Sequence, residues 1–207
     1  MNNLQFIRLL RANTRGCVAG CQANLPVPDF GSLVHIPLDS GLTIFGLVYD
    51  IHIDDDGLVR QLTAAGEIPE EVIQDNRANR NVPLELSILF IGHENNGRIS
   101  HLLPPRPPLS LDSIFPCTPD EICAFTAAGK YGYFRHILAM QEVLPADLLA
   151  AHLVQAGQAQ LAGGRPGWLQ EAVREVISLL RDDHSTLTAV LGAIADAYPL
   201  ISFERQA

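Results

Sequence analysis

Residues 42–53 read Leu42-Thr-Ile-Phe-Gly-Leu-Val-Tyr-Asp-Ile-His-Ile53, a run rich in β-branched and aromatic side chains. Residues of these types favour β-strands. Gly46 interrupts the run, as expected where a strand bends sharply or carries a bulge. A second stretch, Leu84-Glu-Leu-Ser-Ile-Leu-Phe-Ile-Gly-His93, begins with alternating apolar and polar residues. The two stretches predict two strands of a β-sheet.

Shorter strand signals lie around these two segments. Residues 33–38 form an apolar run that is separated from residue 42 by the turn triplet Asp39-Ser40-Gly41. Asn96-Gly97 is a strong hairpin signal and precedes the strand candidate Arg98-Ile-Ser-His-Leu-Leu103. Residues 17–23 are a weaker strand candidate. Several short strands separated by turns predict a small barrel or sandwich.

The proline-rich segment Pro104-Pro-Arg-Pro-Pro108 ends this pattern. Proline cannot donate a backbone hydrogen bond to a sheet, so the segment is expected to be extended and to leave the sheet. We therefore expect a domain boundary between this segment and residue 118. The predicted division is a β-barrel over 1–116 and a helical domain over 117–207.

The second half of the chain has helical signals. Thr118-Pro-Asp-Glu121 is a capping box with proline at the first helical position. Pro145 begins a second helix, and Trp168 begins a third after a glycine-rich break. Apolar residues at helical spacing over 187–195 predict another. The predicted fold class is α+β, with a small N-terminal β-barrel followed by a C-terminal α-helical bundle.

Composition excludes several classes of protein. Of the 207 residues, 47% are hydrophobic and 18% are charged, which is enough apolar material for a core. The formal net charge of −9 argues against direct binding to nucleic acid. A weaker alternative is a DNA clamp that uses an arginine strip. No apolar run is long enough to span a membrane and no secretory signal is present, so a cytoplasmic protein without a membrane partner is expected. The arginine strip of the DNA-clamp alternative would consist of Arg8, Arg11, Arg15, Arg77 and Arg80.

No sequence motif indicates catalysis. A phosphate-binding loop needs a Gly-Lys pair followed by Ser or Thr, and Lys130 is the only lysine in the chain. Tyr131 follows it and Ala124 stands where the first glycine would lie, so this motif is absent. The cysteine spacings, between Cys17 and Cys21 and between Cys117 and Cys123, miss the usual zinc patterns. We expect no catalytic residue, cofactor or metal from these patterns.

Two segments resemble a known family. Phe30-Gly-Ser-Leu-Val-His-Ile36 and Phe45-Gly-Leu-Val-Tyr-Asp-Ile51 are similar to the core of the HAS barrel. This barrel is the N-terminal domain of HerA-type DNA-translocating ATPases and of the α and β subunits of rotary ATP synthases. The resemblance covers residues 14–128. HerA relatives continue into a P-loop ATPase domain, whereas this chain continues into helices, so the resemblance implies only the barrel's role in aligning subunits and docking partners.

Two functional hypotheses follow. In the first, the chain is a non-catalytic protein that self-associates or is accessory to a separate HerA-like ATPase or nuclease. The strand around Phe45, Leu47 and Tyr49 would then form the interaction surface. In the second, the chain is a small-ligand-binding protein or an enzyme with a site between barrel and helices. The candidate side chains of that site are His93, His101, Arg135 and His136.

Overall fold

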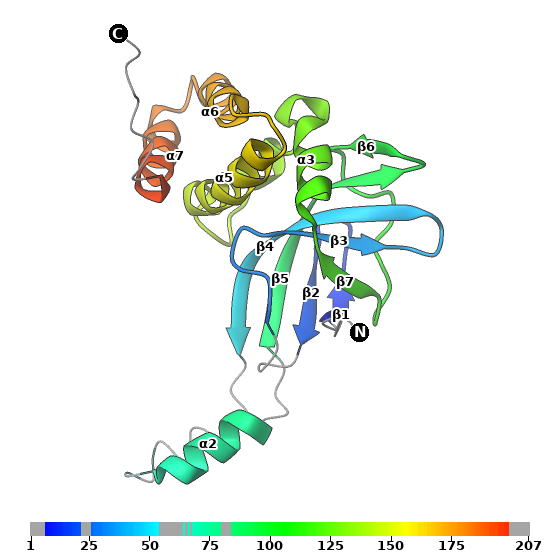
Figure 1. Cartoon of the computed structure of the whole chain (residues 1–207), viewed down its shortest axis with the longest axis vertical. Coiled ribbons are helices and arrows are strands. Elements are labelled where there is room, and N and C mark those ends of the chain that lie inside the picture. Colours follow the sequence, from blue (N-terminus) through cyan, green and yellow to red (C-terminus); the bar gives the residue numbers. More distant parts are fainter. Residues whose placement is uncertain are drawn as a thin grey trace.

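The two long strands predicted from the sequence form the centre of the sheet (Figure 1). β4 (Leu42–Ile53) pairs antiparallel with β5 (Leu84–Asn95), from Leu42 opposite Asn95 to Ile53 opposite Leu84. The pairing register shifts between Phe45 and Gly46, which confirms the bulge expected at this glycine. This computed structural model describes residues 7–21, 26–53, 64, 66, 68–79 and 84–198, and for 75–79 the backbone alone.

Six strands close into an antiparallel barrel, as predicted. Their order around the barrel is β2-β1-β7-β3-β4-β5, and β2 pairs with β5 to complete the circle. β6 follows the Asn96-Gly97 turn and pairs antiparallel with the end of β5, but it is not one of the six strands that close the barrel. The remaining strands are β1 (Ile7–Ala12), β2 (Gly16–Cys21), β3 (Leu33–Pro37), β6 (Arg98–Ser100) and β7 (Ser113–Pro116).

Both faces of the central strands are buried, because alternate side chains enter two different cores. Ile44 and Val48 of β4 point into the barrel, where they pack with residues such as Phe90. Phe45 and Leu47 point outward and pack against the helices. A strand with two buried faces needs apolar residues at consecutive positions, which explains the continuous apolar run of β4.

The C-terminal half consists of helices that cover one side of the barrel, as Figure 1 shows. Their core is continuous with the outer face of the barrel: Leu89 and Ile91 of β5 belong to the same cluster as Phe125, Tyr133 and Trp168. The helices are α3 (Pro119–Ala127), α4 (Phe134–Leu138), α5 (Pro145–Ala162), α6 (Trp168–Leu179) and α7 (His184–Ala197), with a 3-10 turn, η1 (Gly129–Tyr131), between α3 and α4. β7 ends at Pro116 and Thr118 caps α3, so the chain passes from barrel to helices there.

The proline-rich segment runs outside the sheet, as expected, between β6 and β7. The strand predicted over 98–103 ends earlier, at Ser100, because the chain turns toward the prolines. β1 and β7 were not predicted as strands. β7 has only four residues, and β1 contains two arginines, which weakens its apolar pattern.

The connection between β4 and β5 contains α2 (Glu70–Asn79), which begins after Pro69 with two acidic residues in its first turn, as predicted. Figure 1 shows α2 at the end of the barrel remote from α5, α6 and α7. Within the residues that the structure describes, no helix combines the length and the apolar character needed to cross a bilayer.

Candidate functional site

A hollow of about 250 Å³ lies between the barrel and the helices. Arg11 and Arg15 line it from the β1–β2 hairpin, Tyr49 lines it from β4, and Met140 and Glu142 line it from the segment between α4 and α5. The second hypothesis expected a site at this junction. However, none of its four candidate side chains lines this hollow.

Three of those four candidates meet elsewhere, at the end of β6. Arg135 and His136 of α4 both donate to the backbone carbonyl of His101, and the distance from His136 Nε2 to that oxygen is 2.9 Å. His93 lies apart, with its Nδ1 3.1 Å from the Leu102 carbonyl. These two hydrogen bonds connect side chains of α4 to the backbone that directly follows β6. This contact contributes to the fold, because Arg135 and His136 each donate a hydrogen bond to the backbone of His101.

His101 is the buried member of this group. Its Nε2 lies 3.1 Å from the carbonyl of Phe125, while Nδ1 is buried without a hydrogen bond in the described part of the chain. Burial lowers the pKa of His101 and outweighs the carbonyls of Phe125 and Gly129, which favour the protonated ring. Burial likewise lowers the pKa of His136. Both rings are therefore biased toward the neutral form.

The proposed interaction strand is largely covered by the chain itself. Phe45 is 3% exposed and Leu47 is fully buried, and both pack under the helices. The expectation that they form a surface for partners is wrong for these two residues, because α3 and its neighbours already occupy that face of β4. Tyr49 is half-buried and lines the hollow.

Three arginines of the suggested DNA strip have side chains that the structure describes, namely Arg8, Arg11 and Arg15. Arg8 contacts the Leu111 carbonyl and the Ser113 hydroxyl, across the β1–β7 pair. Arg11 and Arg15 line the hollow. The Arg77 side chain and Arg80 lie outside the described residues.

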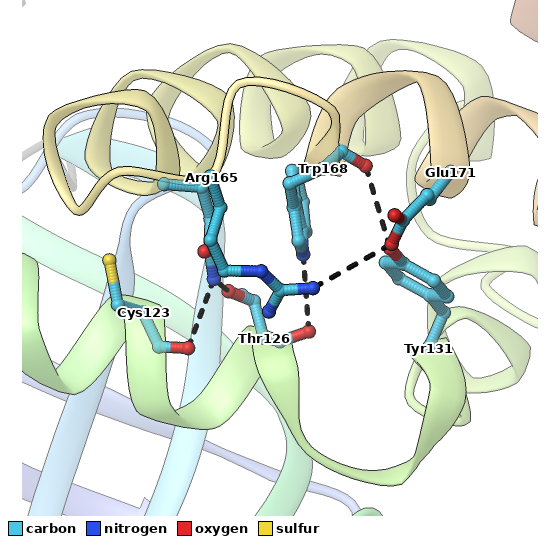
Figure 2. Close-up of polar contacts among 7 residues, drawn as sticks. Cys123, Thr126, Tyr131, Arg165, Trp168 and Glu171 are labelled. Atoms are coloured by element: carbon cyan, nitrogen blue, oxygen red, sulfur yellow. Dashed lines mark hydrogen bonds and ion pairs between the residues drawn. The ribbon is translucent and has the colours of Figure 1, made fainter.

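A polar network joins α3 to α5 and α6 (Figure 2). The buried Gln160 amide donates to the Cys123 carbonyl and to the Thr126 hydroxyl, at 3.0 and 2.7 Å. Trp168 Nε1 donates to the Thr126 carbonyl at 3.4 Å. Arg165 and Tyr131 both contact the Glu171 carboxylate, at 3.6 and 3.1 Å. These contacts tie α3 to α5 and α6, so we assign them a structural role.

A different group of side chains gathers on the outer face of β3. His35, Cys117 and Glu121 place their potential metal-ligand atoms within 4.8 Å of one another. The Cys117 Sγ lies 3.8 Å and the Glu121 Oε1 lies 3.5 Å from the same atom, His35 Nδ1. Burial, with a contribution from the Glu121 carboxylate, raises the pKa of the Cys117 thiol well above its usual range. The thiol is therefore neutral at physiological pH in the absence of a cation.

Sequence reasoning missed this group because its members are far apart in the chain. It compared Cys117 only with other cysteines, whereas its neighbour His35 is 82 positions away. Two local signals were available. His35 occupies an outward position in a strand, between the inward Val34 and Ile36, and Cys117 precedes Glu121 by four residues.

The fold defines the class of this protein: an α+β protein in which helices cover one side of a closed, six-stranded antiparallel barrel. No family model matches the chain, and no curated protein matches its sequence.

Proposed function

We propose that this chain is a non-catalytic cytoplasmic protein that assembles through its barrel with a second copy of itself. In this proposal the barrel has the role that the HAS-barrel resemblance implies, namely aligning subunits. A separate HerA-like ATPase or nuclease is the further partner that this resemblance suggests. The single observation that carries the proposal is a set of exposed leucines on the barrel.

We name Leu10, Leu109 and Leu111 the leucine patch. Leu109 and Leu111 are 75% and 71% exposed, and Leu10 of β1 is 39% exposed. The backbone N–H of Leu111 donates to the Leu9 carbonyl at 2.8 Å, and the Ser110 hydroxyl donates to the Leu10 carbonyl at 3.3 Å. These hydrogen bonds bring the residues that follow the proline-rich segment against β1, so the backbones of the three leucines lie close together.

The backbone of Leu111 adds support, because its φ of 73° lies in the left-handed region. A leucine there is strained by roughly 1–2 kcal/mol, and glycine or asparagine would be the usual choice. Because the Leu111 side chain is exposed, it gains no burial in the isolated chain that would offset this backbone strain. Burial against a partner gives this side chain a role, since burying one leucine contributes about 1.5–3 kcal/mol.

The test is native mass spectrometry and sedimentation of the full chain over a range of concentrations. We expect a dimer or ring that dissociates on dilution. In the double variant L109S/L111S the dissociation constant should rise at least about 100-fold, because two buried leucines are lost per contact. The matched control is L144S/L161S, which changes two leucines of similar exposure on the helical half.

Two results would contradict the proposal. One is a wild-type chain that stays monomeric at every concentration. The other is an oligomer whose dissociation constant is the same in L109S/L111S as in wild type. A monomer that instead binds the barrel of a HerA-like ATPase would replace self-association by the accessory role.

The small-ligand hypothesis is favoured by one observation, the hollow between barrel and helices. Its two arginines would suit a small anion, because guanidinium groups bind carboxylate and phosphate well. The volume of about 250 Å³ is small for a ligand site. Calorimetric titration with inorganic phosphate and with small carboxylates tests this hypothesis. Binding that is lost in R11Q/R15Q and kept in R98Q would favour it over assembly.

A further inference from the structure

The His35, Cys117 and Glu121 side chains come from three elements that the barrel closure brings together. His35 lies in β3, Cys117 directly follows β7, and Glu121 lies in the first turn of α3. β3 pairs with β7, so that His35 is opposite Phe115. The backbone N–H of Cys117 donates to the Leu33 carbonyl at 2.9 Å, which fixes the cysteine beside the strand.

Two of the three distances between the ligand atoms are close to those of tetrahedral coordination, and all three atoms lie within 4.8 Å of one another. Zn–N and Zn–O bonds of about 2.0 Å and a Zn–S bond of about 2.3 Å place tetrahedral N and O ligands about 3.3 Å apart, and N and S ligands about 3.5 Å apart. The corresponding distances from His35 Nδ1 are 3.5 Å to Glu121 Oε1 and 3.8 Å to Cys117 Sγ. Side-chain shifts of a few tenths of an ångström would close both to the expected values.

Two of the three side chains are already held in place by neighbours. The second carboxylate oxygen of Glu121, Oε2, accepts from the backbone N–H and the hydroxyl of Thr118, at 2.7 and 2.9 Å. This leaves Oε1 directed toward His35. The His35 ring stacks on Phe115 with centroids 5.5 Å apart and planes inclined by 29°. Orientation of ligands by such outer contacts is typical of protein metal sites.

The ligand types identify the cation. Calcium and magnesium take oxygen ligands, so a thiolate and an imidazole argue against both. Nitrogen, sulfur and oxygen ligands at tetrahedral spacing suit Zn²⁺. One thiolate and one carboxylate would also balance the charge of a divalent ion, which compensates for bringing two anions together in a half-buried place.

We propose that His35, Cys117 and Glu121 form a zinc site with an open fourth position. Among the residues that the structure describes, no fourth His, Cys, Asp or Glu joins the group. Three protein ligands and one open position are typical of zinc sites that hold a water or a small ligand. Cys117 also lines a hollow of about 220 Å³, together with Asp29, Ile122 and Gln155. This hollow offers room for such a ligand beside the sulfur.

The experiment uses the full chain, freed of metal with a chelator and kept reduced. Titration with Co²⁺, which replaces Zn²⁺ and is visible spectroscopically, should give one ion per chain. The spectrum should contain the intense d–d bands of a tetrahedral ion and a thiolate-to-metal charge-transfer band. Addition of Zn²⁺ should remove these bands and raise the thermal unfolding temperature, since an ion that binds only the folded state stabilises it.

Substitutions assign the ligands. C117S should abolish the charge-transfer band and lower zinc affinity by more than about 100-fold, because changes outside the ligand shell already cost 10–100-fold. H35Q should weaken binding to a similar extent. E121Q should do so while keeping the helix cap, since glutamine also serves in a capping box. The matched control is C123S, which changes the other half-buried cysteine of this region, whose Sγ contacts the Ala159 carbonyl.

Three results would overturn the proposal. The wild-type chain could fail to bind Co²⁺ and Zn²⁺ stoichiometrically. The bound Co²⁺ could show no thiolate band, which would mean ligation elsewhere. Zinc affinity could be lost in C123S and kept in C117S. The wild-type spectrum decides the question even if a variant does not fold.

Discussion

At the scale of single residues, the contact between barrel and helices depends on Gly31 and His152. The Gly31 backbone has a φ of 81°, its N–H donates to the Val48 carbonyl at 2.8 Å, and its carbonyl lies 3.4 Å from His152 Nδ1. The other ring nitrogen of His152, Nε2, lies 3.1 Å from the Tyr133 hydroxyl. Both ring nitrogens of this buried histidine therefore have partners in the fold.

We expect G31A to lower the free energy of unfolding by about 2–5 kcal/mol. A left-handed backbone costs an alanine roughly 1–2 kcal/mol, and overpacking adds roughly 1–3 kcal/mol. The new Cβ would lie 2.7 Å from the Ala151 Cβ and 2.9 Å from the His152 nitrogen, so α5 must move. The control is G41A, since Gly41 has a φ of 79° with nothing within 4 Å of its Cβ position. Urea unfolding measures both, and equal losses would mean that α5 does not press on Gly31.

His152 should make the protein less stable in acid. Complete burial lowers its pKa from 6.5 to about 4, against a smaller opposite effect of the Gly31 carbonyl. Between these two values the unfolded chain binds a proton that the folded chain excludes, so stability falls as the pH drops from about 6.5 to about 4. The loss from this residue reaches about 3 kcal/mol.

Urea unfolding at a series of pH values measures this effect. H152Q should unfold with a shallower pH dependence than wild type, whatever its stability at neutral pH. H184Q, at an exposed position on α7, should keep the wild-type slope. Identical slopes in H152Q and wild type would assign the acid sensitivity to other groups, such as His101 and His136.

At the scale of elements, α3 is held at both ends by polar contacts. Its N-terminus has the predicted capping box, in which the Thr118 hydroxyl accepts from the Glu121 N–H at 3.3 Å and the Glu121 carboxylate accepts from the Thr118 N–H. Its C-terminal end meets α5 and α6 through Gln160 and Trp168 (Figure 2). The capping box is local and was visible in the sequence, whereas the Gln160 contacts depend on packing.

We expect Q160L to destabilise the protein by about 1–3 kcal/mol. The buried amide donates to the Cys123 carbonyl and to the Thr126 hydroxyl, and leucine removes both hydrogen bonds. Q158L, an exposed position on the same helix, should change stability by less than about 0.5 kcal/mol. Thermal or urea unfolding compares the two. A stability of Q160L equal to that of Q158L would show that the network contributes nothing to the packing of α3.

At the scale of the whole molecule, the barrel and the helices share one core. Leu33, Phe45, Leu47, Leu89 and Ile91 of the barrel are buried by residues of the helical half. Removal of the helices would expose this face to water. An exposed apolar face of this kind favours aggregation.

We therefore expect the full chain to unfold in one cooperative transition, with equal calorimetric and van't Hoff enthalpies. A fragment of residues 1–116 should aggregate or fail to reach a stable barrel. Scanning calorimetry of the full chain and circular dichroism of the fragment test this. Two separate transitions, or a stable monomeric fragment, would show that the barrel folds independently of the helices.

Local patterns were sufficient for most of the elements. Alternation and turn residues predicted β3, β4 and β5, and caps and helical periodicity predicted α3, α5, α6 and α7. Such signals are properties of neighbouring residues, so the α+β class and the barrel could be read from the chain. β1 and β7 were not predicted, because β7 is short and β1 contains charged residues. Both become strands by pairing with their neighbours in the sheet.

The tertiary structure alone decided which side chains meet. It placed Phe45 and Leu47 under the helices, because a strand in the middle of this fold has two buried faces. It also joined His35 to Cys117 and Glu121 by pairing β3 with β7. The sequence by itself determined the elements, since hydrogen bonding and burial within an element follow local periodicity. The candidate sites depend on contacts between distant segments, which form only when barrel closure and helix packing bring those segments together.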